Sequence, residues 1–146
     1  MIPVTVNPID SLQWLASTVW MEAEGESYEG KLAVAFCIAN RAQRGRRSIS
    51  DVVLTAWQFS AWNTDSTTRM KLDALRADDS IWLECVRAAV EALFNSVPDP
   101  ITGRTLYMNE AIVLRARGSL PEWWTVAGGR DPGLKIGAHT FRFDVT

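Results

Sequence analysis

The sequence predicts a mainly α-helical protein of the α+β class, and three observations support this prediction. Apolar stripes with helical spacing cover residues 10–22, 27–44 and 81–95. Two short β-favouring segments, residues 105–109 and 136–143, come only late in the chain. The 146 residues match one ordinary domain, and a hydrophobic content of 47% can supply one core. We therefore expect residues 1–146 to form a single domain.

The first predicted helix begins at the N-cap residue Asp10 and runs into three closely spaced carboxylates. Its apolar stripe consists of Leu12, Leu15, Ala16 and Val19. Glu22 continues this stripe near Gly25, which can end the helix, so its carboxyl group is expected on the buried face. Burial disfavours the charged form and raises the pKa, which suits a general acid. Glu24 and Glu26 are expected in solvent, and an exposed acidic helix end for all three is the alternative.

The second helix is expected from the N-cap Ser27 to about Arg44, with Gly45 as its C-terminal stop. Residues 32–39 are apolar on every side, a pattern typical of a helix that is buried all round. We expect this segment to be the central core helix against which the others pack.

An aromatic and polar motif, Gln58-Phe59-Ser60, follows a short helix that is predicted to start at Ser50 and Asp51. Aromatic rings stack on pyranose faces while amides bond hydroxyl groups, so these residues are candidates for binding a sugar. A core position for the ring with a surface loop around it is the alternative.

The remaining predictions concern the second half of the chain. They are a helix capped by Asp79 or Ser80 over residues 81–95, a strand over 105–109, a short helix over 111–117, a loop over 127–137 and a strand over 136–143. Tyr107 and Asn109 share one strand face and can line a binding site. His139 shares its face with Phe141, and it either anchors the last strand or serves the site.

Composition excludes several classes of function. With 15 basic and 17 acidic side chains, the formal charge of -2 argues against a dedicated nucleic-acid binder. Residues 1–8 do not resemble a signal peptide, and no stretch is long enough for a transmembrane helix, so we expect synthesis in a cytoplasm without an export signal. Cys37 and Cys85 lie far apart in apolar helical runs and are expected to be reduced core residues.

The residue types also limit the chemistry. His139 is the only histidine, which excludes a zinc site built from several histidines. A Ser-His-Asp or Cys-His site would need this same residue, and no Gly-x-Ser-x-Gly motif, phosphate loop or dinucleotide fingerprint is present. Acid–base chemistry by carboxylates remains, and Glu22 is the leading candidate. Glycoside cleavage commonly uses two carboxylates, and one suffices when groups of the substrate take part.

Taken together, the motifs resemble the cell wall hydrolases of the SleB and CwlJ type, which cleave peptidoglycan and include the spore-cortex lytic enzymes. Each motif alone is weak, but the ordered set spans residues 12–143 and is specific. The matching pieces are Glu22-Ala23-Glu24-Gly25-Glu26, Tyr28 to Ala35, Asn40-Arg41, Gln58-Phe59-Ser60, the helix with Trp82 and Cys85, Asp99 to Gly103, Tyr107 with Asn109, and Ile136 to Phe141.

The resemblance implies a lysozyme-like single catalytic domain, mainly helical, with a small antiparallel sheet. It implies lytic transglycosylase activity on the glycan strand of bacterial peptidoglycan, between N-acetylmuramic acid and N-acetylglucosamine, with Glu22 as the acid and no metal or cofactor. The implied substrate-binding residues are Glu26, Gln58, Phe59, Ser60, Tyr107, Asn109 and His139. The domain is expected to be a monomer that acts on the cell wall.

One position departs from the family pattern, because Glu24 stands where members usually carry a basic residue. A catalytic domain without an export signal resembles a phage endolysin. Three alternatives stay open. The first is a muramidase with Glu26 or Glu24 as base, the second is a peptidoglycan-binding module without turnover, and the third is a Cys or Ser peptidase. The adjacent rings of Trp123 and Trp124 can either stack on glycan or fill the core.

Overall fold

The computed structural model describes residues 8–55, 79–127 and 131–144, and it confirms the mainly helical α+β class. Its helices are α1 (Pro8–Ala23), α2 (Tyr28–Gly45), α3 (Ile49–Leu54), α5 (Ser80–Phe94), α6 (Glu110–Arg117) and α7 (Glu122–Ala127). The strands are β1 (Leu106–Met108), β2 (Leu134–Ile136) and β3 (His139–Arg142).

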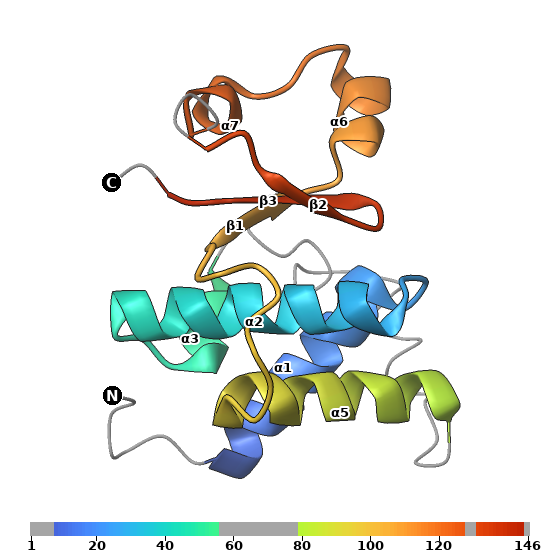
Figure 1. Cartoon of the computed structure of the whole chain (residues 1–146), viewed down its shortest axis with the longest axis vertical. Helices are drawn as coiled ribbons and strands as arrows, with labels where there is room; N and C mark the ends of the chain where they lie inside the picture. The colour runs from blue at the N-terminus through green and yellow to red at the C-terminus, as the bar shows by residue number, and fades with distance from the viewer. Residues whose placement is uncertain (1–7, 56–78, 128–130, 145–146) are drawn as a thin grey trace.

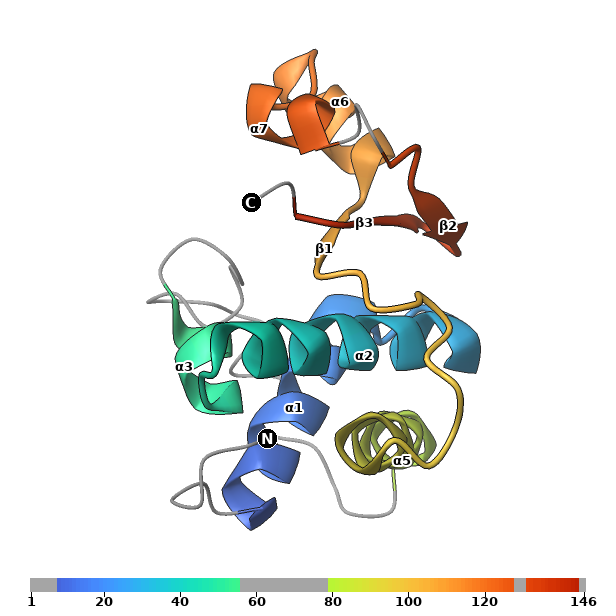
Figure 2. The same ribbon diagram turned by 60° about the vertical axis from the view of Figure 1, so that its left-hand side comes forward.

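The elements form a helical body, a small sheet and a pair of short helices. Helices α1, α2 and α5 pack against one another, and α3 packs on α1 and α2. The sheet lies across α2, and α6 and α7 lie on the far side of the sheet in both views (Figures 1 and 2). The sheet therefore separates the helical body from α6 and α7.

Helix α2 is the central core helix, as its apolar middle predicts. Val34, Phe36 and Ile38 are each at most 1% exposed, and the buried residues of α1 and α5 join them in one core. The hydroxyl group of Ser27 accepts the backbone N–H of Gly30 at 3.2 Å, so the predicted N-cap is confirmed. The core thus fixes α2 immediately after the Glu22–Glu26 segment.

The end of α2 differs from the prediction, because Gly45 is its last helical residue and Arg46 is the cap. Arg46 takes a left-handed backbone conformation with φ of 52°, and its N–H donates to the carbonyl groups of Ala42 and Gln43. A glycine usually occupies such a position, and the preference for glycine placed the predicted end one residue early.

Two further caps define the short helix α3 and the long helix α5. Ser48, not the predicted Ser50, caps α3, since its hydroxyl group accepts the N–H of Asp51 at 3.0 Å. Asp79 caps α5 through the N–H of Trp82 at 2.9 Å, which confirms that prediction. Both are the short polar residues that helix starts favour.

The three strands form an antiparallel sheet in the order β1-β3-β2. Strand β2 was missed, because the sequence predicts a loop over residues 127–137 and a continuous strand over 136–143. Gly137, with φ of 60°, instead makes a tight turn in which Ile136 pairs with His139. A three-residue strand is too short to show alternation, so its pattern could not be distinguished from a loop.

The two adjacent tryptophans have different environments. Trp124 is 0% exposed, donates from Nε1 to Oε2 of Glu110 at 3.1 Å, and carries the Arg142 guanidinium 4.6 Å above its ring. Trp123 is 57% exposed. Trp124 therefore fills the small core beneath α7, a helix that the sequence did not predict.

Polar side chains of α2 hold the start of β1. Asn40 Nδ2 donates to Oδ2 of Asp99 at 2.9 Å and to the carbonyl group of Arg104 at 3.1 Å. Arg41 donates from Nε and Nη2 to the carbonyl group of Thr105 at 2.9 and 2.7 Å. The Asn40-Arg41 motif therefore fixes the strand that carries Tyr107 against the helical body.

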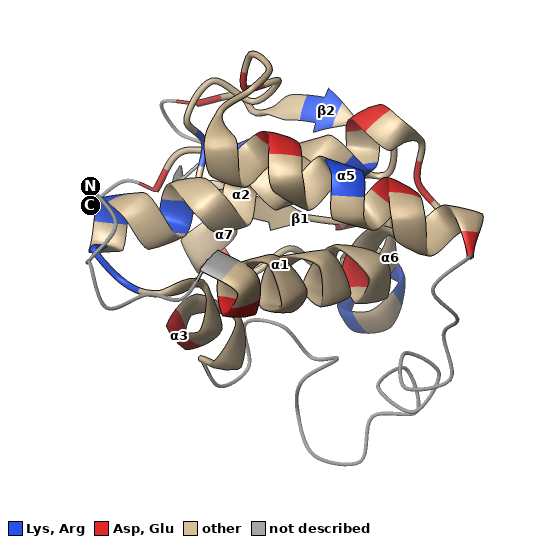
Figure 3. Ribbon diagram, turned by 90° about the horizontal axis from the view of Figure 1, so that it is seen from below, with Lys and Arg blue, Asp and Glu red and all other residues tan. Residues whose placement is uncertain are grey.

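Charges of both signs lie along α5 at the surface of the helical body (Figure 3). Arg87 Nε lies 2.8 Å from Oε1 of Glu91 one turn later, and Glu84 lies 3.3 Å from Nζ of Lys31. The Arg87–Glu91 pair has an exposed guanidinium and contributes little to stability, whereas the ammonium group of Lys31 is buried. Among the described residues, no helix combines the length and the apolar character that crossing a bilayer would require.

Replacing the N-cap of α2 tests how its start is fixed. Ser27→Ala removes the acceptor for the N–H of Gly30 and is expected to lower the free energy of unfolding by about 1 kcal/mol. Ser27→Asp keeps an acceptor and should stay near the wild-type value. Urea denaturation measures both, with Ser119→Ala at an exposed position as the control. Equal stability of the two Ala variants would show that the cap contributes nothing.

Candidate active site

Glu22 lies in the last turn of α1, on the side of the helix that faces the core. Its neighbours on the same face, Val19 and Ala23, are 0% and 3% exposed. Burial of the carboxyl group raises its pKa from 4.5 to about 7. Glu22 can therefore hold a proton near neutral pH, as the apolar stripe of the sequence predicts.

Tyr107 of β1 meets Glu22 from the sheet. Its hydroxyl group forms a hydrogen bond with the Glu22 carboxyl group, and this bond lowers the pKa of Glu22 against the larger effect of burial. Burial, followed by the nearby Glu22 charge, raises the pKa of Tyr107 well above 10, so the phenol keeps its proton and acts as a donor. The structure therefore brings these two predicted site residues together.

Glu24 and Glu26 differ in a way that the sequence did not show. Glu24 is exposed, as predicted. Glu26 is not in solvent, because only 17% of its side chain is exposed and its Oε1 lies 3.0 Å from Nδ1 of His139. The same oxygen accepts the N–H of Ala138 at 3.0 Å. Ala138 is 112 residues away in sequence, so no local pattern could reveal this contact.

The sequence carries one signal for this contact. Gly137 interrupts the predicted strand over residues 136–143, and an isolated glycine in a strand pattern often marks a turn or a close backbone approach. That turn is where Ala138 presents its N–H to Glu26. The Gly137-Ala138 turn is thus a site element that sequence reasoning missed.

His139 anchors β3 next to Tyr107. It is 7% exposed, its ring centroid lies 5.1 Å from that of Tyr107 in an edge-to-face arrangement, and the Phe141 ring lies 6.2 Å away. Burial lowers the pKa of His139 below 6.5, and the opposing effect of Glu26 is smaller. The imidazole is therefore neutral at pH 7, and its predicted shared face with Phe141 is confirmed.

Asn109 is not part of β1 but begins the next helix. Its Oδ1 accepts the N–H of Ile112 at 3.2 Å, which makes it the N-cap of α6. The predicted strand over residues 105–109 was too long because β1 ends at Met108. Gln58, Phe59 and Ser60, the other predicted substrate contacts, lie outside the described residues.

Cys37 and Cys85 are buried free thiols, which confirms that both are reduced core residues. Burial raises the pKa of each thiol to about 12. Because the thiolate is the nucleophilic form, neither residue can serve as a nucleophile near neutral pH.

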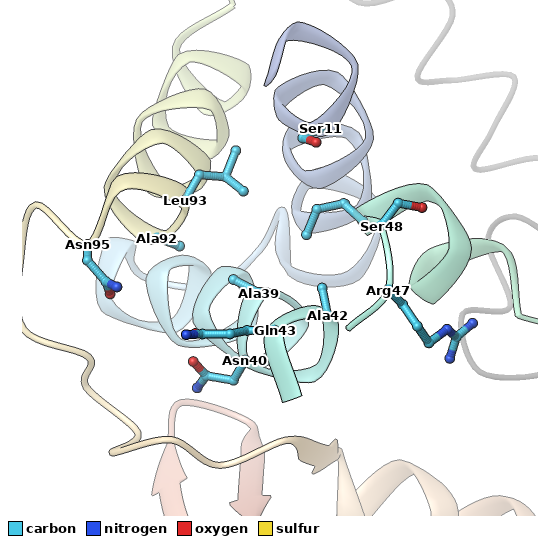
Figure 4. Close-up of a pocket in the computed structure, with 11 residues that line it drawn as sticks. Ser11, Ala39, Asn40, Ala42, Gln43, Arg47, Ser48, Ala92, Leu93 and Asn95 are labelled. Carbon is cyan, nitrogen blue, oxygen red and sulfur yellow. The ribbon is translucent and has the colours of Figure 1, made fainter. Parts of the chain in front are cut away.

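A separate pocket lies at the other end of α1 and α2 (Figure 4). It is lined by residues of α1, α2, α5 and the start of α3, including Ser11, Asn40, Gln43, Arg47 and Asn95. Eleven helical positions, about 16 Å of rise, separate Ser11 from Glu22. The lining contains no carboxylate, so this pocket offers no proton donor of the Glu22 kind.

Solved structures show that the fold is that of the SleB catalytic domains. The chain superposes on the catalytic domain of a germination-specific lytic transglycosylase, SleB from Bacillus anthracis, with a TM-score of 0.66 and 22% identity. The match covers 97% of this chain and 99% of that one. The Bacillus cereus SleB catalytic domain gives a TM-score of 0.67 at 23% identity, over 97% and 94% of the two chains.

Sequence comparison then identifies the family. The family model described as Cell Wall Hydrolase matches residues 25–142, so the chain belongs to the cell wall hydrolase family. A curated relative, the spore cortex-lytic enzyme of Oceanobacillus iheyensis, is 33% identical over 102 residues, 67% of this chain. The chain spans 32% of that relative's length. The family predicted from the ordered motifs is confirmed.

The raised pKa of Glu22 predicts a pH-dependent contribution to stability. Between pH 4.5 and about 7 the folded protein binds more protons at Glu22 than the unfolded chain, so stability is present at low pH and is lost as the pH rises. A shift from 4.5 to about 7 corresponds to about 3 kcal/mol. Wild type should therefore lose up to about 3 kcal/mol relative to Glu22→Gln between pH 4 and pH 8.

Denaturation of both proteins across this pH range measures the difference. The lowered pKa of His139 acts with the opposite sign, adding stability as the pH rises, but it is common to both proteins and cancels. Parallel curves for wild type and Glu22→Gln would contradict a raised pKa at Glu22.

The buried thiols predict resistance to alkylation. Because Cys37 and Cys85 are buried and their pKa values are about 12, iodoacetamide at pH 7 should leave the activity of the native protein unchanged. Mass spectrometry of the treated protein checks that no thiol has reacted, and the urea-unfolded chain serves as the reactive control. Rapid inactivation with modification of either thiol would revive the Cys peptidase alternative.

Proposed function

We propose that this chain is a peptidoglycan lytic transglycosylase that cleaves between N-acetylmuramic acid and N-acetylglucosamine with Glu22 as its acid. The observation that carries the proposal is the buried Glu22 carboxyl group, whose pKa is raised to about 7 and which Tyr107 contacts. Membership of the cell wall hydrolase family and the SleB catalytic-domain fold support this reaction. Residues 1–146 act as a single catalytic domain in this proposal.

In the first step, protonated Glu22 donates its proton to the glycosidic oxygen as the bond from C1 to that oxygen breaks. Positive charge develops at C1 of the muramic acid residue, and Glu22 is left as a carboxylate. In the second step this carboxylate takes the proton of the muramic acid 6-hydroxyl group while that oxygen bonds to C1. The products are a 1,6-anhydro end and a free 4-hydroxyl group, and Glu22 is again protonated.

Tyr107 favours the proton transfer in this mechanism. Its hydroxyl group donates a hydrogen bond that stabilises the charged form of Glu22, which is the form that appears as the bond breaks. Arg41 donates to the carbonyl group of Thr105 and so holds the chain where β1 begins. Burial keeps the proton on Glu22 before reaction, and Tyr107 limits how strongly it is kept.

The arrangement favours a transglycosylase over a muramidase that uses water. A muramidase of this kind needs a second carboxylate as base, and the sequence offers Glu24 or Glu26. Glu26 Oε1 already accepts the N–H of Ala138 and lies against His139, while Glu24 is exposed. Among the described residues, Glu22 is the carboxyl group that contacts Tyr107, which suits an internal attack by the substrate's own hydroxyl group.

A binding module without turnover is disfavoured by the same carboxyl group. Keeping Glu22 buried costs about 3 kcal/mol of stability above pH 7, and a module that only binds glycan gains nothing from this cost. Gln58, Phe59, Ser60, Asn109 and His139 stay as predicted substrate contacts. The cell wall as the place of action, a phage endolysin role and a monomeric state belong to the same proposal.

The products of digestion test the proposal. Purified peptidoglycan incubated with wild type is expected to release anhydro-muropeptides, and Glu22→Gln, which keeps the shape but loses the transferable proton, should release none. Mass spectrometry of the soluble fraction distinguishes the outcomes. Reducing muramic acid ends would indicate a muramidase, and equal turnover by Glu22→Gln would remove Glu22 from the mechanism.

The pH dependence of turnover gives a second test. Because Glu22 must be protonated to act, and its pKa is about 7, kcat/KM should fall tenfold for each pH unit above about 7. Release of soluble muropeptides at constant ionic strength measures this limb. A flat profile between pH 6 and pH 9 would exclude Glu22 as the general acid.

A further inference from the structure

Glu26 connects the turn after α1 to the hairpin formed by β2 and β3. Its Oε1 accepts the N–H of Ala138 at 3.0 Å and lies 3.0 Å from Nδ1 of His139. Its side chain is 17% exposed. The backbone N–H donor on this oxygen holds the carboxylate in place, with the His139 ring packed beside it.

Two glycines make room for the Glu26 side chain. A Cβ on Gly137 would lie 2.7 Å from Oε2 of Glu26, and that residue also has φ of 60°. On the other side, a Cβ on Gly30 would lie 2.9 Å from Cβ of Glu26. Either distance is shorter than a van der Waals contact allows. The backbone at both glycines therefore packs directly against the Glu26 side chain, and a larger residue would not fit at either position.

The backbone of Glu26 is fixed as well. Lys31 is 2% exposed, and its Nζ donates to the carbonyl group of Glu26 while lying 3.3 Å from Oε2 of Glu84 on α5. The ammonium group therefore joins the turn after α1 to α5. Glu26 is a rigid support for the hairpin rather than a mobile surface carboxylate.

From this support a short series of contacts leads back to Glu22. His139 packs the edge of its ring against Tyr107, with 5.1 Å between centroids and an interplanar angle of 88°. The Tyr107 hydroxyl group in turn forms its hydrogen bond with Glu22. The series runs from Glu26 through His139 and Tyr107 to Glu22, and each member touches the next.

We propose that Glu26 is a positioning residue, whose carboxylate fixes the hairpin and His139 and thereby holds the Tyr107 hydroxyl group on Glu22. The inference rests on the proposed role of Glu22 as the acid. It changes the role expected for Glu26, since the carboxylate acts on the protein's own hairpin and not on substrate. His139 acts on Tyr107 through the contact between their rings, so the imidazole does not need to be charged.

Other ionisable groups face this series from the packed elements. Arg41 and Cys37 of α2 face Tyr107, and their electrostatic effects on it have opposite signs. Glu22 faces Tyr107 from α1, and Glu26 is the charged group that acts on His139. A variant of Glu26 leaves Arg41 and Cys37 in place. A change in the pKa of Glu22 in that variant therefore reports a change in the position of Tyr107.

The test is a carboxyl NMR titration of Glu22 in the full chain, which does not depend on turnover. Tyr107→Phe removes the hydrogen bond that lowers the pKa of Glu22, so that pKa should rise by about one unit. Glu26→Ala frees the hairpin and should raise the pKa of Glu22 in the same direction. In the double variant Glu26→Ala should add no further shift, because the hydrogen bond is already lost.

Two controls separate positioning from charge and from general destabilisation. Glu26→Gln keeps an acceptor for the N–H of Ala138 and should preserve the wild-type titration of Glu22. Glu29→Ala removes an exposed carboxylate from the same segment and should also leave it unchanged. If Glu26→Ala destabilises the chain too far to titrate, His139→Ala removes the ring that contacts Tyr107 and should raise the pKa of Glu22 in the same direction, whereas an unchanged pKa would overturn the positioning role.

The outcomes distinguish this inference from the proposed function. An unchanged pKa of Glu22 in Glu26→Ala, an additive shift in the double variant, or a shift in Glu26→Gln equal to that in Glu26→Ala would overturn the positioning role. Failure of the proposed function would appear elsewhere, as wild type that releases no anhydro-muropeptides. The two results are independent, because the titration is measured without substrate.

Discussion

The partial burial of the Glu22 carboxyl group is the constraint on which the rest of the site depends. Burial raises its pKa from 4.5 to about 7, so one residue carries both a stability cost and a proton that can be donated. Tyr107 opposes this shift with a hydrogen bond. The balance between burial and that bond sets the proton affinity at a value useful near neutral pH.

The Glu22 and Tyr107 side chains come from distant parts of the chain, and the fold brings them together. Glu22 lies in the last turn of α1, while Tyr107 lies on β1, which packs on α2. Arg41 secures β1 from α2, and Glu26 secures the neighbouring hairpin from the turn after α1. Among the described residues, side chains of α2 and Glu26 therefore tie the sheet to the helical body. Small sheets in such a position depend on these ties for their placement.

The sequence patterns predicted those features that depend on residues close together in the chain. The apolar stripe of α1 indicated the burial of Glu22, and side-chain caps indicated the starts of α2 and α5, because each depends on residues within one or two turns. The partner of Glu26 lies 112 residues away, so no periodicity could reveal it. Strand β2 was too short to show alternation, and Arg46 took a left-handed position that is normally a glycine's.

The most direct measurement is the titration of the Glu22 carboxyl group in the wild-type protein by carbon-detected NMR. The account predicts a midpoint of about 7, because burial outweighs the hydrogen bond from Tyr107. A midpoint near 4.5 would mean that Glu22 is ionised at neutral pH. That result would contradict its role as a proton donor, whatever products the enzyme releases.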